Sequence, residues 1–209
     1  MIETYLHTRV LAAPRQWRGV ADGIIRDGLP GGQVYGVWRS QIGRPRDELT
    51  VLTLWPDAAG AEAEEALDAM PNIVACESDA MIPTLRPSST EPPRRQGNYA
   101  FRWFELPERH WSEFQDLCTA AWPNFEASYD SQVIGLWRCQ NEDPGRCRSL
   151  LLTRRPDLAM WERSKIPQGE TEVEVRRQLS RRYDLCDDTV VYTTTLLSAE
   201  GRDDTVRWT

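Results

Sequence analysis

Three side chains near the N-terminus have the types and the spacing for acid–base chemistry, namely Tyr5, His7 and Arg9. Successive side chains of an extended strand point to opposite faces, so these three would share one face. The imidazole of His7 titrates near neutral pH and would act as a general acid or base. Arg9 would bind a carboxylate or stabilise an oxyanion, and Tyr5 would orient the substrate. These residues are the predicted catalytic set.

A second group of residues would form an apolar wall for the same ligand. The positions that lie 94 residues after the catalytic set all hold aromatic side chains. An apolar wall facing a few convergent polar groups is the usual form of a small-molecule site. The predicted substrate-binding residues are Trp38, Tyr99, Phe101, Trp103 and Trp137.

Each of these residues also has a structural alternative. Trp38 and Trp137 occupy equivalent positions in the two halves of the chain, as do Tyr5 and Tyr99, and residues kept in both halves are expected to serve core packing. A single strand histidine is often a hydrogen-bonded structural residue. His110, next to a predicted helix start, is expected to be exposed. The functional prediction therefore depends on the pair that is not repeated, the histidine and arginine of the first strand.

The two halves are related by an internal repeat. Residues 33–39 read QVYGVWR and residues 132–138 read QVIGLWR, so five of seven positions are identical at an offset of 99. Residues 51–57 match residues 151–157 at an offset of 100, and Trp17 matches Trp111 at an offset of 94. Three matches in the same order predict a duplication. Each copy places a glycine two residues before a tryptophan, which leaves room for the indole ring or for a ligand.

Residue patterns predict the same order of elements in both copies. In the first copy we expect strands at 3–11, 33–40, 48–55 and 79–86, with helices at 14–26 and 58–70 and Asp57 as the cap of the second. In the second copy we expect strands at 98–105, 132–139, 148–155 and 189–198, with helices at 108–122 and from Asp157. The segment 122–126 is expected to connect helix and strand. An additional helix at 170–183 has no counterpart in the first copy.

The order β-α-β-β-α-β is the ferredoxin-like plan, in which helices cover one face of a sheet. The other face must be buried, and a second copy can bury it. The predicted fold class is α+β, with two tandem ferredoxin-like βαββαβ repeats whose antiparallel sheets form one dimeric-type α/β barrel within the chain. The expected domains are repeat 1 (1–86), an extended or mobile proline-rich linker (87–98), repeat 2 (99–199) and a C-terminal tail (200–209).

Composition excludes several function classes. A net charge of −7 and a pI of about 5.0 argue against a nucleic-acid partner. The sequence has neither a run of about 20 apolar residues nor a signal peptide, so we expect no membrane contact and a cytoplasmic location. Five cysteines without a CxxC pair and two histidines predict reduced thiols and no metal site. Arginine supplies 24 of the 25 cationic side chains, which indicates a GC-rich bacterial genome or, alternatively, planar anion recognition.

The repeated pattern resembles a known family. A tryptophan at the start of each first helix, a G-x-W-R strand in each half and a T-x-x-P-D junction resemble the NIPSNAP proteins of the dimeric α/β barrel superfamily, over residues 2–198. The resemblance implies the fold. Members of the superfamily include cofactor-free monooxygenases of aromatic substrates, heme-binding enzymes, isomerases, dehydratases and ligand-binding modules, so the fold does not select an activity.

Three functions follow as alternatives. The first is an enzyme without nucleotide or other cofactor, of the oxygenase, isomerase or lyase type, that acts on a small, partly aromatic molecule inside the barrel. The second is a non-catalytic binding or scaffold protein with the same pocket. The third is a heme protein with His7 or His110 as axial ligand. The expected partner is a small-molecule ligand, and the chain would be a monomer or a homodimer.

Overall fold

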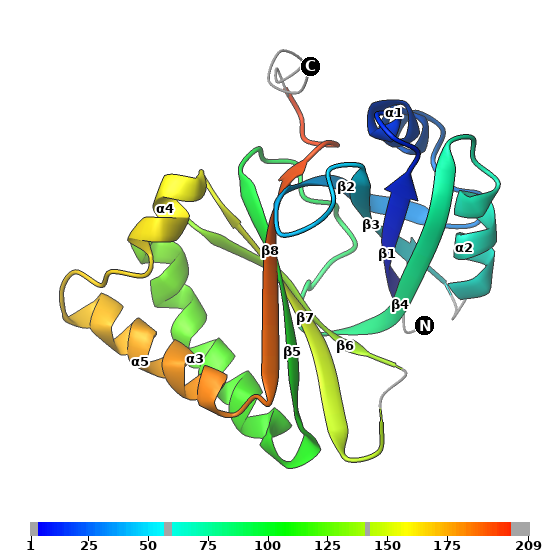
Figure 1. Ribbon diagram of the computed structural model, residues 1–209. Coiled ribbons are helices and arrows are strands. Elements are labelled where there is room, and N and C mark those ends of the chain that lie inside the picture. The colour runs from blue at the N-terminus through cyan, green and yellow to red at the C-terminus, as the bar shows by residue number, and fades with distance from the viewer. Residues whose placement is uncertain (1–3, 57–59, 141–142, 202–209) are drawn as a thin grey trace. The chain divides into compact units, whose positions relative to one another are not determined.

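The computed structural model describes residues 4–56, 60–140 and 143–201. Its eight strands follow the order β1-β3-β2-β8-β5-β7-β6-β4, which closes on itself as a barrel. Each repeat supplies four of the strands (Figure 1). The predicted α+β fold class is therefore confirmed. Within the described residues, none of the helices is long and apolar enough to cross a membrane.

The chain divides into two compact units. Unit 1 comprises residues 1–79, 90–96 and 194–209, and unit 2 comprises residues 80–89 and 97–193. The divisions fall within β4 (Ile73–Arg86) and β8 (Asp188–Leu196), so each of these strands contributes to both units. The expected domain boundaries at 86 and 99 refer to the repeats in the sequence and remain a prediction.

Unit 1 places two helices on one face of its strands. The elements are β1 (Thr4–Ala12), α1 (Trp17–Asp27), β2 (Gln33–Ile42), β3 (Glu48–Trp55) and α2 (Gly60–Asp68). Helix α1 buries apolar side chains at the helical spacing, including Trp17, Val20 and Ile24, against Val10 and Val37 of the strands. The expected cap Asp57 lies outside the described residues.

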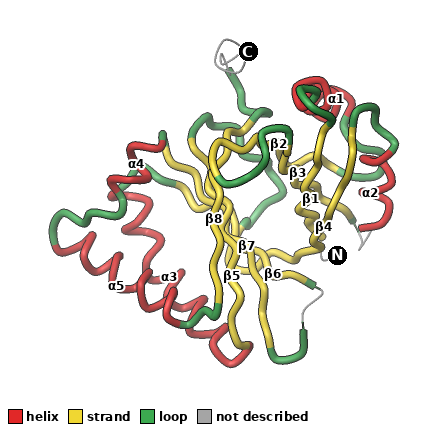
Figure 2. The backbone as a smooth tube through the Cα atoms, in the orientation of Figure 1, coloured by secondary structure: helices red, strands yellow, loops and turns green. Residues whose placement is uncertain are grey.

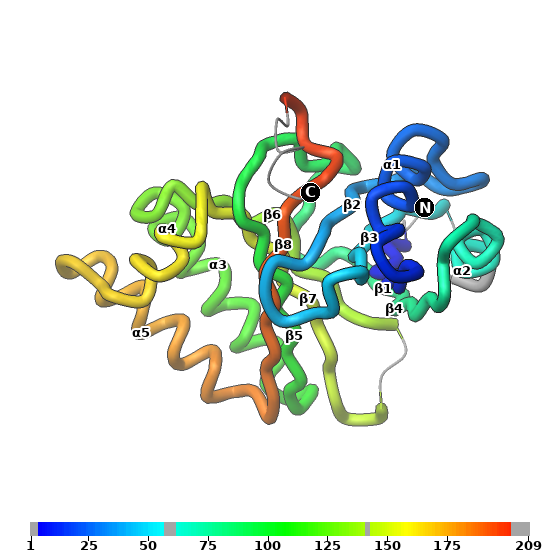
Figure 3. Tube along the Cα trace, turned by 45° about the horizontal axis from the view of Figure 1, so that its top comes forward, coloured from blue at the N-terminus to red at the C-terminus, as the bar shows by residue number. Residues whose placement is uncertain are grey.

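Unit 2 has a larger helical layer. Its elements are β5 (Asn98–Pro107), a 3₁₀ turn (Glu108–His110), α3 (Trp111–Ser128), β6 (Gln132–Cys139), β7 (Arg146–Arg155), α4 (Leu158–Arg163), α5 (Glu170–Asp184) and the first part of β8. Helices α3, α4 and α5 gather on one side of the unit's strands (Figures 1 and 2). Helix α5 is the predicted additional helix, and it packs along α3 (Figure 3).

Two predicted boundaries are wrong by several residues. Strand β4 begins at Ile73 instead of residue 79. Helix α3 continues through Pro123 to Ser128 instead of ending at residue 122. An internal proline removes a backbone hydrogen bond and normally ends or kinks a helix. Here the last turns bury Phe125 and Tyr129 in the core of unit 2, and this packing offsets the cost. By contrast, the predicted helix start near Asp157 is confirmed. Helix α4 begins at Leu158, and the carboxylate of Asp157 caps it by accepting a hydrogen bond from the backbone N–H of Met160 at 2.7 Å.

Candidate functional site

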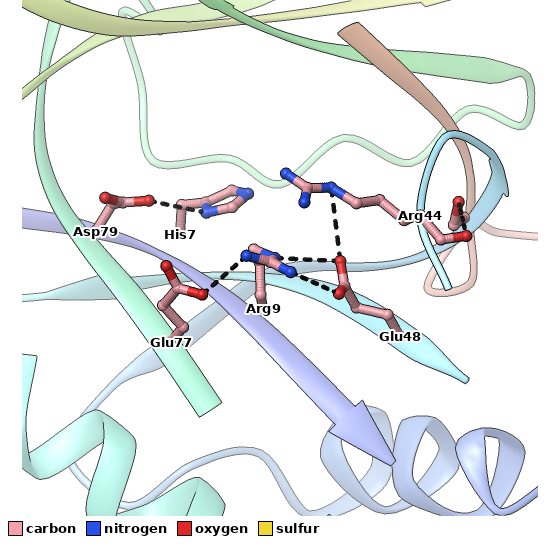
Figure 4. Close-up of polar contacts among 7 residues, drawn as sticks. His7, Arg9, Arg44, Glu48, Glu77 and Asp79 are labelled. Atoms are coloured by element: carbon pink, nitrogen blue, oxygen red, sulfur yellow. Dashed lines mark hydrogen bonds and ion pairs between the residues drawn. The ribbon is translucent and has the colours of Figure 1, made fainter. Parts of the chain in front are cut away.

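The predicted catalytic histidine and arginine of unit 1 belong to a polar cluster (Figure 4). His7 is fully buried, and its Nδ1 lies 3.6 Å from a carboxylate oxygen of Asp79. The guanidinium of Arg9 donates to Glu48 at 2.9 Å and to Glu77 at 2.8 Å. The cluster lies on the helix-distal face of the unit, which we define as the face of β1 opposite to the residues packed on α1.

The exposure of these groups decides which of them a ligand can reach. The side chain of His7 is 0% exposed, whereas those of Asp79 and Arg9 are 23% and 30% exposed. A ligand on this face would therefore meet Asp79 and Arg9 first, with His7 behind them. Arg9 already holds two carboxylates, so its predicted role in binding a substrate anion would have to compete with Glu48 and Glu77.

Tyr5, the third predicted catalytic residue, has a packing partner. Its ring meets that of Tyr35 edge to face, with centroids 5.3 Å apart and an interplanar angle of 84°. Tyr5 is 1% exposed. This geometry supports the structural alternative for Tyr5, and substrate orientation stays a prediction.

The glycine–tryptophan pairs have a packing role in both units. A Cβ added to Gly36 would lie 2.3 Å from the indole of Trp38, and one added to Gly135 would lie 2.3 Å from Trp137. In each unit the strand register shifts just before the glycine, as at a β-bulge. The space above each glycine is thus occupied by the tryptophan ring and is not open to a ligand.

The other predicted substrate-binding residues lie in unit 2. Phe101 stacks on Tyr192 with ring centroids 5.2 Å apart, and Trp103 lies under the guanidinium of Arg148 at 4.1 Å. Tyr99 is fully buried. The structure brings Tyr5, His7 and Arg9 together in unit 1 and Tyr99, Phe101 and Trp103 together on β5 of unit 2. Their role in ligand binding remains a prediction.

Unit 2 contains a cavity between its strands and helices α3, α4 and α5, on the face of β5 opposite to Tyr99, Phe101 and Trp103. Its volume is about 500 Å³, within the range of small-molecule sites. Part of the wall is apolar and aromatic, with Phe104, Trp122, Phe125, Val133, Leu151 and Trp161. Five cationic side chains also line it, against the single carboxylate of Asp184: Arg102, Arg155, Lys165, Arg176 and Arg182.

Burial perturbs two of these arginines. The pKa of Arg102 is lowered to about 10, first by burial and then by the charges of Arg182 and Arg176. Burial likewise lowers the pKa of Arg155 to about 10, with the charge of Arg102 as the second cause. Both effects disfavour the charged form, because the cations are removed from water and lie near one another. The cavity therefore concentrates positive charge in a partly dehydrated space.

Sequence reasoning missed these arginines, although the repeat contained the signal. At helix-facing positions, Thr8 of the first copy corresponds to Arg102, and Trp55 corresponds to Arg155. The register supports this equivalence, because Thr8 pairs with Val51 as Arg102 pairs with Leu151. Both arginines lie at positions that strand alternation assigns to the helix layer, where apolar side chains are expected.

The described residues do not fit a metal or a heme. They contain no group of three or more histidine, cysteine or acidic side chains that could hold a metal ion. No histidine lines the cavity of unit 2. His7 is fully buried beside Asp79, and Nδ1 of His110 lies 3.2 Å from the carbonyl oxygen of Leu185. Neither ring faces the cavity of unit 2.

Comparison with known proteins supports the fold. No family model and no curated protein matches the chain, whereas 78 chains of solved structures do. An anthrone oxidase-like protein is 9% identical with a TM-score of 0.60, over 94% of this chain and 92% of its own. Chlorite dismutase from Candidatus Nitrospira defluvii is 8% identical with a TM-score of 0.56, over 92% and 90%.

A third solved structure is a ferredoxin-fold protein from Listeria monocytogenes that is related to antibiotic biosynthesis monooxygenases. It is 9% identical, with a TM-score of 0.51 over 94% of this chain and 95% of its own. At such low identity the likeness concerns the fold alone. The chain has the ferredoxin-like dimeric α/β barrel fold that these proteins share.

Proposed function

We propose that the protein binds a small molecule on the helix-distal face of unit 1 and exchanges a proton with it. The observation that carries this proposal is the buried imidazole of His7 beside the partly exposed carboxylate of Asp79, at 3.6 Å. A carboxylate and an imidazole that lie close together can accept a proton and pass it on. The pair can therefore hold a proton that a ligand gives up at Asp79.

The proposed step is a reversible proton transfer. A ligand C–H or O–H group gives its proton to Asp79, and the carboxylic acid passes it to the neutral imidazole of His7. The ligand keeps the bonding electrons, and the proton later returns to the same or a different ligand atom. The second outcome is an isomerisation, which needs no further reactant. Arg9 would lie beside the ligand and hold Glu48 and Glu77 in place.

The finer assignment, a NIPSNAP-like protein, is also a proposal. It is supported by the repeated G-x-W-R strands and the T-x-x-P-D junction. It is compatible with the barrel fold, which several small-molecule enzymes and binding proteins have. A cytoplasmic location without nucleic-acid or membrane partners belongs to the same proposal.

A ligand screen tests the proposal. We expect ligand-observed NMR to find small molecules whose binding is weakened in Asp79→Asn. Binding should be unaffected in His110→Gln, the control that makes the same change as His7→Gln at the other histidine. Hits should exchange a carbon-bound hydrogen for deuterium in D₂O with the wild type, and this exchange should fall at least about tenfold in His7→Gln. Exchange that persists unchanged in His7→Gln would contradict the assigned role.

The same experiment separates the alternatives. Binding with no deuterium exchange would support the non-catalytic binding or scaffold function. A Soret band in the purified protein, or on addition of hemin to it, would support the heme alternative. It would contradict the conclusion that neither His7 nor His110 is placed to ligate heme.

A further inference from the structure

Three arginines that line the cavity of unit 2, the buried Arg155 and Arg182 and the partly buried Arg102, lack the carboxylates that such groups normally have. Among the described residues, no Asp or Glu forms an ion pair with Arg102, Arg155 or Arg182. Arg155 is 8% exposed and Arg182 is 7% exposed, and the Nε of each is buried without a hydrogen-bond partner. A buried charge without a counter-charge is costly, so proteins normally pair it.

The few contacts that these arginines do make are neutral ones. Arg155 donates to the hydroxyl of Thr153 at 3.1 Å and lies over the ring of Phe125 at 5.1 Å. Arg182 donates to the thiol of Cys118 at 3.4 Å and lies over the ring of Phe104 at 4.9 Å. Burial raises the pKa of the Cys118 thiol, so it does not supply a thiolate. These contacts orient the guanidinium groups and leave their charge uncompensated.

Unit 1 shows that the fold itself does not require an arginine here. Trp55, the counterpart of Arg155, donates from its indole nitrogen to Thr53 at 2.8 Å, as Arg155 donates to Thr153. The threonine is therefore kept, while its partner changes from a neutral indole to a cation. A substitution that introduces an unpaired buried charge lowers stability, which favours a functional reason for it.

We infer that the cavity of unit 2 binds a small organic anion with an apolar or aromatic body. The anionic group meets Arg102, Arg155 and Arg182, whose planar donors match the oxygens of a carboxylate, sulfonate or phosphate. The body of the ligand packs on Trp122 and Phe125. Exposed Arg176 and Lys165 at the rim attract the anion from solution. This site lies in unit 2, so it is independent of the proton-transfer function proposed for unit 1.

Three probes separate the contributions of the ligand's charge and of its aromatic part to binding. Anilinonaphthalene sulfonate is an aromatic anion, N-phenyl-naphthylamine has the same body without the charge, and inorganic phosphate has the charge alone. Fluorescence titration of the full chain should show saturable binding of the sulfonate at one site. Binding of the neutral amine should be at least about tenfold weaker, and phosphate should displace the sulfonate only at much higher concentration.

Matched variants locate the site. We expect Arg155→Leu to weaken sulfonate binding at least about tenfold and to leave amine binding nearly unchanged. Arg148→Leu removes the same charge from the same strand, but on the face of Trp103, and should leave both affinities unchanged. Arg176→Leu changes an exposed rim residue and should weaken sulfonate binding less than Arg155→Leu does.

Two outcomes would contradict the inference. Equal affinity for the sulfonate and the neutral amine, or equal effects of Arg155→Leu and Arg148→Leu, would show an apolar or hydrated cavity with no anion site. If Arg155→Leu fails to fold, Arg176→Leu and Arg102→Leu carry the test. Sulfonate binding that is unchanged in both would overturn the inference.

Discussion

At the scale of single residues, we expect the protein to gain stability when a partly buried cation without a counter-charge is removed. Burial lowers the pKa of Arg102, so the charged form destabilises the folded state at every pH below the folded-state value of about 10. We predict that Arg102→Leu raises the free energy of unfolding of the ligand-free chain by about 1 kcal/mol or more. Urea denaturation at neutral pH measures this change.

Arg148→Leu is the control for that measurement, because it removes the same charge from a guanidinium that is 39% exposed. It should not raise the free energy of unfolding, because this guanidinium is exposed and its contact with the Trp103 ring is lost. A loss of stability in Arg102→Leu would mean that the charge is compensated in the folded protein.

A second residue-scale prediction concerns the glycine beneath each tryptophan. The Cβ of an alanine at position 135 would overlap the ring of Trp137, and overpacking costs typically about 1–3 kcal/mol. We therefore expect Gly135→Ala to lower the free energy of unfolding by about that amount. Gly19→Ala is the control, since nothing lies within 4 Å of its added Cβ and alanine favours the exposed helix. Equal effects of the two substitutions would contradict the packing role.

At the scale of elements, Glu172 fixes the start of α5, which forms one side of the cavity. Both guanidinium nitrogens of Arg163 donate to its carboxylate, at 2.8 and 2.9 Å, and the N–H of Gln168 donates at 2.6 Å. The Arg163 side chain first, and the Gln168 N–H second, hold the pKa of Glu172 below its ordinary value of 4.5. The carboxylate thus ties the loop after α4 to the first turn of α5.

The pH dependence of this link follows from the direction of the shift. A lowered folded-state pKa contributes stability that is present above pH 4.5 and is lost as the pH falls through the folded-state value. We predict that amide hydrogen exchange of α5, corrected for its intrinsic pH dependence, is slower in the wild type than in Glu172→Gln at pH 6. The difference should disappear in strong acid. A difference that grows on acidification would contradict the assigned role.

The sequence predicted most elements and failed where tertiary packing overrides a local rule. Strand β3 and strand β6 have the predicted boundaries, because their repeated motifs carry alternating or buried apolar residues. The end of α3 was wrong, since Pro123 normally interrupts a helix and only the burial of Phe125 and Tyr129 keeps this one. The helix at 170–183 was predicted, but its periodicity did not show that it would pack along α3 and line a cavity.

At the scale of the whole molecule, the duplication supplies an internal reference for function. The net charge of −7 gave no sign of the cationic cavity, because a sum over the chain does not show where charges lie. The excess of arginine allowed planar anion recognition as an alternative to genome composition, and the cavity supports it for a few of the 24 arginines. The predicted site on β1 follows from strand alternation and stays a prediction, whereas the cavity depends on the packing of α5, which has no counterpart in the first copy.

The two copies also suggest the most direct test, which is to replace the two arginines of unit 2 by the residues at the equivalent positions of unit 1. The double variant Arg102→Thr, Arg155→Trp restores the first-copy residues, and Thr153 can accept from an indole as Thr53 does. Isothermal titration with anilinonaphthalene sulfonate should then show a chain that folds as before and binds the anion at least about tenfold more weakly than the wild type. A folded double variant with unchanged affinity would contradict an anion site built from these arginines.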